Sequence, residues 1–127
     1  MKRKIRNGFS LLELVMALGI LSIGFLSLSS LSISTMKAGK YSQNRTAALQ
    51  LAQEKIESLK AISFSELAGE TETGLKTGTL GTIFHRETNV QKGIDASLAD
   101  IKVRVLWPMA SNPLHFHSLE LNTRIAG

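Results

Sequence analysis

An unbroken apolar segment near the start of the chain most limits what this sequence can fold into. Residues 14–36 contain no charged side chain. A helix advances about 1.5 Å per residue, so about 20 such residues cross a bilayer core roughly 30 Å thick. The serines within the segment do not break a helix, because a hydroxyl can bond to a carbonyl one turn earlier. The sequence therefore predicts one membrane-spanning helix.

The charges that precede this segment predict its orientation. The cations before Gly8 are Lys2, Arg3, Lys4 and Arg6. Short flanks rich in Lys and Arg stay on the cytoplasmic side of a membrane. We therefore expect a cytoplasmic N-terminus and a C-terminal domain on the other side of the membrane.

Glu13 is the only ionisable side chain between Phe9 and Met36. Placing a lone carboxylate in apolar surroundings costs at least a few kcal/mol of free energy, so such a residue is expected to have a function. One interpretation is that Glu13 reaches water at the interface and has no role. The other is that it meets a positive charge from another molecule, such as the α-amino group of a neighbouring copy cut just before Phe9.

The order of these features resembles the class III signal of type IV prepilins. The matching residues are the basic leader, then Gly8, Phe9, Ser10, Leu11, Leu12 and Glu13, then the apolar helix. The resemblance implies that a prepilin peptidase cuts between Gly8 and Phe9 and methylates the new N-terminus at Phe9. It also implies that Glu13 pairs with the N-terminal amine of an adjacent subunit during assembly.

Two points qualify this resemblance. Many major pilins carry a proline within the span, and this chain has none there, which leaves the path of the helix open. An ordinary signal peptide is the alternative explanation of a basic start and an apolar segment. It fits less well, because its apolar region is usually about 7–15 residues long and ends at an Ala-x-Ala-like site.

Charge and cysteine content narrow the classes of function. Removing the four leader cations leaves 11 cations against 10 anions, so the formal net charge falls from +5 to +1. The basic character thus belongs largely to the leader and does not predict a nucleic-acid surface. The chain has no cysteine, which excludes disulfides and thiolate chemistry.

Residues 37–62 are predicted to continue the helix outside the membrane. Polar residues first bring the chain into water, and an apolar stripe with spacings of three and four follows: Leu49, Ala52, Ile56, Leu59 and Ile62. We expect one helix from about Phe9 to about Ile62, with the stripe packed by a sheet. A coiled-coil partner is the alternative, for which the stripe is short.

The rest of the chain predicts a small sheet. Residues 63–81 have the Gly and Thr content of a loop, with a short helical turn near 64–68. Strand patterns follow at 82–90, 100–107 and 117–125. Consecutive strands with loops between them predict an antiparallel meander whose inner face covers the helix. The expected fold is therefore α+β and pilin-like: a long N-terminal helix packed by about three antiparallel strands.

Later segments extend the resemblance. Residues 51–60, followed by strands that include 103–107 and a short C-terminal strand, are similar to minor pilins of the PilV type and, less closely, to I-type pseudopilins of type II secretion.

Few residues in the C-terminal region suggest chemistry. His115 and His117 alternate on a predicted strand, but a metal site needs at least a third ligand and none is indicated. We interpret them as surface or edge residues and assign Trp107 to the core. The glycines of residues 69–81 lack the Lys-Ser or Lys-Thr of a phosphate-binding loop. We expect no catalytic residue, no metal and no cofactor, and the chain is not expected to be an enzyme.

The predicted plan has four segments: a leader at residues 1–8, a transmembrane and assembly helix at 9–36, its amphipathic continuation at 37–62, and a periplasmic loop and sheet at 63–127. The expected function is that of a minor type IV pilin in the bacterial inner membrane and then the pilus. Its expected partners are prepilin peptidase and other major and minor pilin subunits, with no nucleic acid. The alternatives are a type II secretion pseudopilin and, less well supported, a DNA-uptake subunit with an exposed basic cluster including Lys102 and Arg104.

Overall fold

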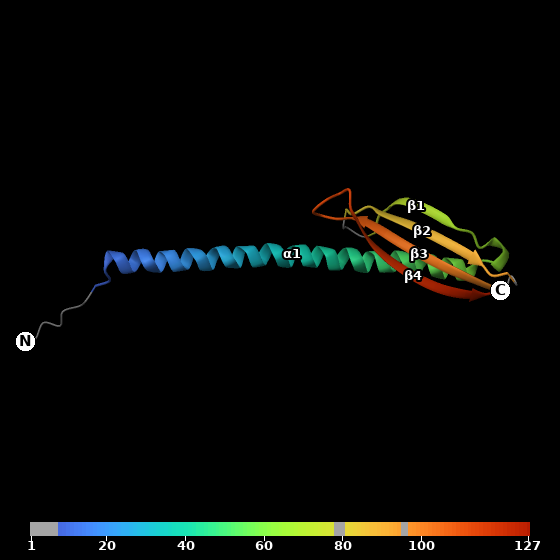
Figure 1. Cartoon of the computed structure of the whole chain (residues 1–127), viewed down its shortest axis with the longest axis horizontal. Coiled ribbons are helices and arrows are strands. Elements are labelled where there is room, and N and C mark those ends of the chain that lie inside the picture. The colour runs from blue at the N-terminus through green and yellow to red at the C-terminus, as the bar shows by residue number, and fades with distance from the viewer. Residues whose placement is uncertain (1–7, 78–80, 95–96) are drawn as a thin grey trace, which may run out of the picture. The chain divides into compact units, whose positions relative to one another are not determined.

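The computed structural model describes residues 8–77, 81–94 and 97–127, and the leader cations at positions 2, 3, 4 and 6 lie outside the described residues. The chain divides between Gly39 and Lys40 into two units. The elements in chain order are α1 (Leu11–Ala61), a short 3-10 turn (Phe64–Glu66), β1 (Glu70–Leu75), β2 (Phe84–Lys92), β3 (Leu98–Pro108) and β4 (Phe116–Ala126) (Figure 1).

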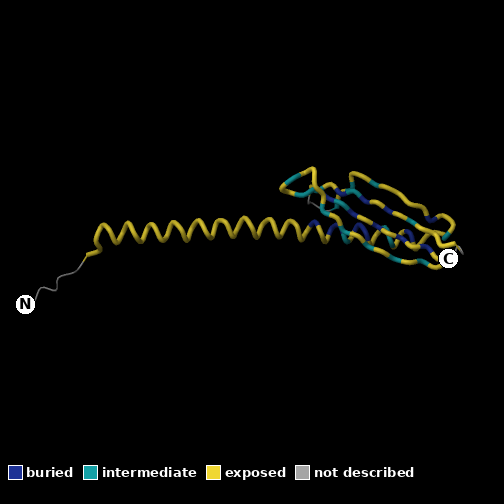
Figure 2. Tube along the Cα trace, in the orientation of Figure 1, coloured by how far each residue is buried: buried dark blue, intermediate teal, exposed yellow. Residues whose placement is uncertain are grey.

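The four strands form an antiparallel meander in the order β1-β2-β3-β4. β3 shows the physical basis of the sheet, because its side chains alternate between the two faces. Ala99, Ile101, Val103, Val105 and Trp107 are buried, whereas the residues between them are largely exposed (Figure 2). The predicted meander and its inner face are confirmed.

The core lies between the inner face of the sheet and the last turns of α1. The buried helix residues in this layer are Asn44, Ala47, Ala48, Leu51, Ala52 and Leu59. Three of them are alanines, whose small side chains let the sheet approach the helix closely. The predicted stripe is therefore partly wrong: Leu49 is only half-buried, and Ile62 lies beyond the end of α1 and is 42% exposed.

The strand count is a second correction, because β1 lies inside the predicted loop. Its sequence, Glu-Thr-Glu-Thr-Gly-Leu, lacks the apolar alternation that identifies a half-buried strand. Pairing with β2 defines it instead, with Glu72 opposite Arg86. The register then shifts between Glu72 and Leu75, where Gly74 has a positive φ of 76°. A glycine accepts that backbone conformation without steric cost.

Candidate functional site

The predicted cleavage position lies just outside the helix. Gly8 and Phe9 precede α1, and Phe9 is 85% exposed. The backbone N–H of Leu14 donates a hydrogen bond to the Ser10 carbonyl (3.1 Å), and the N–H of Glu13 donates one to Ser10 Oγ (3.2 Å). Ser10 is therefore the N-cap of α1. The peptide bond between Gly8 and Phe9 belongs to exposed, non-helical chain.

Ser10 was considered in the sequence only as part of the prepilin-like signal, and its role as a helix cap was missed, although a readable signal was present. A Ser followed three residues later by a Glu, directly before an apolar run, is the pattern of a capping box. This pattern fixes Glu13 at the third position of α1. Sequence reasoning considered Glu13 for its charge alone and so missed its position in the first turn of the helix.

Glu13 has an exposed side chain. A carboxylate in the first turn is favoured by the helix dipole, which places partial positive charge at this end. Within the parts of the chain that the structure describes, no cation forms an ion pair with Glu13.

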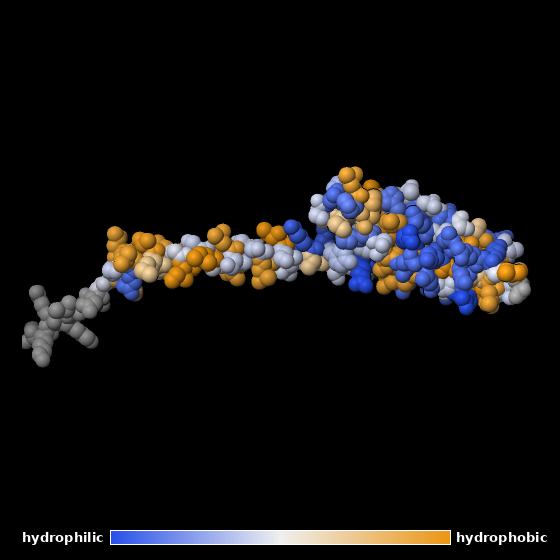
Figure 3. All heavy atoms as spheres, in the orientation of Figure 1, coloured by the Kyte–Doolittle hydropathy of each residue, from blue (hydrophilic) through white to orange (hydrophobic). Residues whose placement is uncertain are grey.

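The apolar half of α1 presents its side chains on all sides. The large hydrophobic residues from Leu11 to Met36 are all more than half exposed, and the helix is long and apolar enough to cross a membrane (Figure 3). The hydroxyls of Ser22, Ser27 and Ser29 each donate a hydrogen bond to the carbonyl four residues earlier, at 2.7, 2.9 and 3.0 Å. These bonds confirm the prediction that the serine hydroxyls find hydrogen-bond acceptors within the helix itself. Such a surface requires lipid or other apolar helices around it.

The histidines occupy different environments. His117 is half-buried, with its ring centroid 4.8 Å from Tyr41 and 5.6 Å from Trp107. His115 is exposed in the turn before β4, where its carbonyl accepts a hydrogen bond from the N–H of Met109. The described residues contain no group of three His, Cys, Asp or Glu side chains able to hold a metal ion. Trp107 is 1% exposed, which confirms its assignment to the core.

The sequence analysis also did not predict a network of ion pairs and hydrogen bonds that joins β1, β2 and α1. Arg86 is buried and donates hydrogen bonds from Nε and Nη2 to the two carboxylate oxygens of Glu72 (2.6 and 2.8 Å) and from Nη1 to the Leu51 carbonyl on α1 (2.8 Å). Lys55 Nζ lies 2.6 Å from Glu70 and 3.4 Å from Glu72. The hydrogen bonds from Arg86 hold the pKa of Glu72 below its usual value. The network connects β1 and β2 to the helix.

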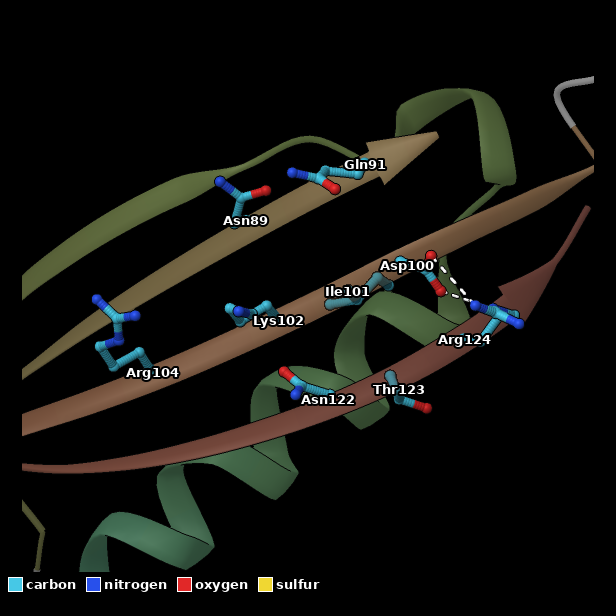
Figure 4. Close-up of a pocket in the computed structure, with 9 residues that line it drawn as sticks. All are labelled: Asn89, Gln91, Asp100, Ile101, Lys102, Arg104, Asn122, Thr123 and Arg124. Atoms are coloured by element: carbon cyan, nitrogen blue, oxygen red, sulfur yellow. Dashed lines mark hydrogen bonds and ion pairs between the residues drawn. The ribbon is translucent and has the colours of Figure 1, made fainter. Parts of the chain in front are cut away.

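The outer face of the sheet is polar and slightly hollowed, with a cavity of about 650 Å³ over β2, β3 and β4 (Figure 4). The two cations of the DNA-uptake hypothesis, Lys102 and Arg104, lie here. Each pairs with Glu120, at 3.2 and 3.1 Å. These contacts, from Arg104 first and then Lys102, lower the pKa of the Glu120 carboxyl. Arg104 also lies 3.7 Å from Glu87 on β2, so the two cations face two carboxylates on the neighbouring strands.

Comparison with protein families gave one match. The family described as "Prokaryotic N-terminal methylation motif" matches residues 3–29, which are 27 of the 127 residues. Comparison with curated proteins and with solved structures gave no match. The chain thus carries a type IV prepilin-like signal, which supports a pilin-like or pseudopilin protein. The match does not extend to the sheet.

Proposed function

We propose that this chain is a minor type IV pilin: a structural subunit that prepilin peptidase cuts between Gly8 and Phe9 and that then joins a pilus through its N-terminal helix. The observation that carries this proposal is the methylation motif at residues 3–29, which coincides with an exposed apolar helix. In this plan residues 1–8 are the leader, 9–36 the transmembrane and assembly helix, 37–62 its continuation and 63–127 the periplasmic sheet region.

The N-terminal geometry supports the cleavage. A peptidase must reach an unfolded peptide bond, and residues 8 and 9 are exposed and precede the first helical turn. The cations of the leader, Lys2, Arg3, Lys4 and Arg6, hold it on the cytoplasmic side. The new α-amino group would lie on Phe9, which becomes the site of methylation.

Glu13 supports the assembly step. It is exposed in the first turn of α1, four positions beyond Phe9. An uncompensated acid in apolar surroundings is costly, so its pairing with the α-amino group of a neighbouring subunit is selective for one register. Repetition of such a contact between unlike surfaces builds a fibre rather than a closed ring.

The first test is the intact mass and N-terminal residue of membrane-extracted protein from cells with and without prepilin peptidase. We expect a chain that begins at methylated Phe9 only when the peptidase is present. A chain that begins at Met1 in both cells, or that is cut after the apolar segment, would contradict the proposal.

The second test separates assembly from insertion. Glu13→Gln keeps the shape of the side chain and removes its charge. A charge-assisted hydrogen bond contributes about 1.5–3 kcal/mol, so incorporation into sheared pili should fall roughly tenfold or more. Membrane insertion and cleavage should be unchanged. Ser22→Ala, which removes only a bond within the helix, is the matched control. Normal incorporation of the Glu13 variant would remove its proposed role.

A pseudopilin of a type II secretion system is the alternative that the same motif fits. It would use the same helix packing in a shorter fibre. The chain should then be found with secretion components, and its deletion should impair protein export without loss of surface pili. A DNA-uptake subunit is less well supported, because Lys102 and Arg104 are paired with Glu120.

A further inference from the structure

One end of the sheet packs against Tyr41, a residue that follows the apolar segment closely in the chain. Tyr41 of α1 lies against the end of β3 and the start of β4, with ring centroids 6.4 Å from Trp107 and 4.8 Å from His117. Tyr41 follows Met36 by only five residues. Because an extended chain spans at most about 3.6 Å per residue, Tyr41 lies within about 18 Å of the end of the span at any angle between the two units.

The same end of the sheet carries exposed apolar side chains. Ile83, Leu114 and Phe116, here called the loop patch, are 44%, 85% and 47% exposed. Phe116 packs edge-on against His85, with ring centroids 5.9 Å apart, and is paired in register with Pro108. Figure 3 shows hydrophobic side chains at the projecting end of the sheet region, where the β3–β4 connection lies in Figure 1.

The connection between β3 and β4 has a defined shape. The N–H of Met109 donates to the His115 carbonyl (2.8 Å), and the N–H of His115 donates to the Asn112 carbonyl (3.0 Å). The N–H of Leu114 donates to Asn112 Oδ1 (3.0 Å). These bonds hold a turn in which Leu114 is exposed. A side chain that is already held in place loses less conformational entropy when it binds a surface than a side chain on a flexible loop does.

The helical segment around Tyr41 carries charges of one sign, and the β3–β4 connection carries no carboxylate. No Asp or Glu occurs from Leu14 to Gln53 or from Val105 to Leu119, whereas Lys37, Lys40 and Arg45 lie in the first of these ranges. Carboxylates of the sheet region occur instead in segments such as 66–72 and 95–100. A surface of anionic phospholipid attracts Lys and Arg and repels carboxylates. The polarity of the domain is therefore complementary to such a surface.

We propose that the loop patch docks on the outer surface of the bilayer that anchors the chain, with Leu114 and Phe116 among anionic phospholipid headgroups. This inference rests on the membrane anchoring in the proposed function. A lipid surface is the occupant that the short tether places within reach of every copy before assembly. Exposed aromatic and aliphatic side chains, together with cations in the segment that joins the domain to the span, are typical of membrane-interface contacts.

Site-directed spin labelling of the full chain in vesicles tests the proposal. The chain has no cysteine, so a single introduced cysteine carries the only label. Ala110→Cys places a label in the β3–β4 connection without changing the patch, and Ala126→Cys places one at the far end of β4 as the matched control. Ile23→Cys reports whether the span is inserted. The readout is the accessibility of each label to oxygen relative to a water-soluble nickel chelate.

In vesicles that contain phosphatidylglycerol, we expect the label at position 110 to be several-fold more oxygen-accessible than the label at 126. The difference should shrink in pure phosphatidylcholine and disappear when Leu114→Glu is added to the Ala110→Cys variant. Ile23→Cys should report a lipid environment throughout.

Three results would overturn the inference. Equal, aqueous accessibility at positions 110 and 126, with position 23 in lipid, would refute docking and leave the anchoring intact. A signal at 110 that rises with the protein-to-lipid ratio would identify a neighbouring copy as the occupant instead. An aqueous label at position 23 would contradict the membrane anchoring itself.

Discussion

Arg86 on β2 and Glu72 on β1 form a bidentate ion pair, and the third donor of Arg86 binds the Leu51 carbonyl on α1. A planar guanidinium suits this arrangement because its donors are fixed in a fork. The pair gives β1 a connection to the core that its sequence does not provide by apolar burial. It therefore explains why a strand made largely of Glu and Thr pairs at the edge of this sheet.

Arg86→Met should destabilise the sheet region by about 2–3 kcal/mol, because it leaves the Glu72 carboxylate partly buried without its partner. Unfolding of the full chain in detergent can be followed by the fluorescence of Trp107, the single tryptophan. Arg124→Met is the matched control, because it removes an exposed pair with Asp100 and should leave the unfolding midpoint unchanged. Equal midpoints for wild type and Arg86→Met would contradict this role.

The same pair predicts an acid dependence of stability. The hydrogen bonds from Arg86 lower the pKa of folded Glu72 below its ordinary value of 4.5. A lowered folded pKa means that the unfolded state binds the proton first as the pH falls. The stabilisation is therefore complete above about pH 4.5 and is lost as the pH falls through the folded pKa.

Glu72→Gln isolates this contribution. The variant should be less stable than wild type at pH 7, and the gap should narrow as the pH falls below 4.5. Other carboxyls with lowered pKa values, such as those of Asp100 and Glu120, act equally in both proteins. Parallel curves of unfolding free energy against pH would show that Glu72 does not contribute.

Local sequence patterns predicted the elements whose stability comes from apolar burial. Alternation along β3 identified its inner face, and a charge-free segment identified the apolar half of α1. β1 was not predicted because its inward contact is the ion pair between Glu72 and Arg86, which are fourteen residues apart. No periodic pattern within a short stretch of sequence indicates such a contact. The face of the helix was placed imperfectly because alanines carry a weak hydrophobic signal, although they permit the closest packing.

The N-terminal site was readable for a different reason. Its residues are contiguous, so the order of Gly8, Phe9 and Glu13 is visible without a fold. The positive charge proposed to meet Glu13 belongs to another molecule, and neither the sequence nor the fold of one chain contains it. Cleavage at Gly8, methylation at Phe9 and pairing at Glu13 therefore stay predictions.

Gly69→Ala should destabilise the start of β1. A Cβ at this position would lie 2.9 Å from the Thr88 carbonyl oxygen, so the backbone of β1 or β2 must move. Overpacking of this kind costs about 1–3 kcal/mol. Gly39→Ala is the control: its Cβ meets nothing within 4 Å, and replacing a helical glycine should stabilise α1 by up to about 1 kcal/mol. Trp107 fluorescence during chemical unfolding should show a lower midpoint for Gly69→Ala alone.

Ser10→Ala should loosen the first turn of α1 without changing the charge of the motif. The variant loses the hydrogen bond from the Glu13 N–H to Ser10 Oγ, and N-cap removal costs about 1 kcal/mol. Amide exchange at Glu13 and Leu14 of the detergent-solubilised chain, the two residues whose N–H groups bond to Ser10, should therefore accelerate by roughly fivefold, since 1.4 kcal/mol corresponds to tenfold. Ser10→Asn, which retains a capping oxygen, should restore slow exchange. Because the cap fixes the turn that carries Glu13, Ser10→Ala should also reduce incorporation into fibres, but less than Glu13→Gln does. Unchanged exchange at Glu13 in Ser10→Ala would show that the first turn is held by something other than its cap.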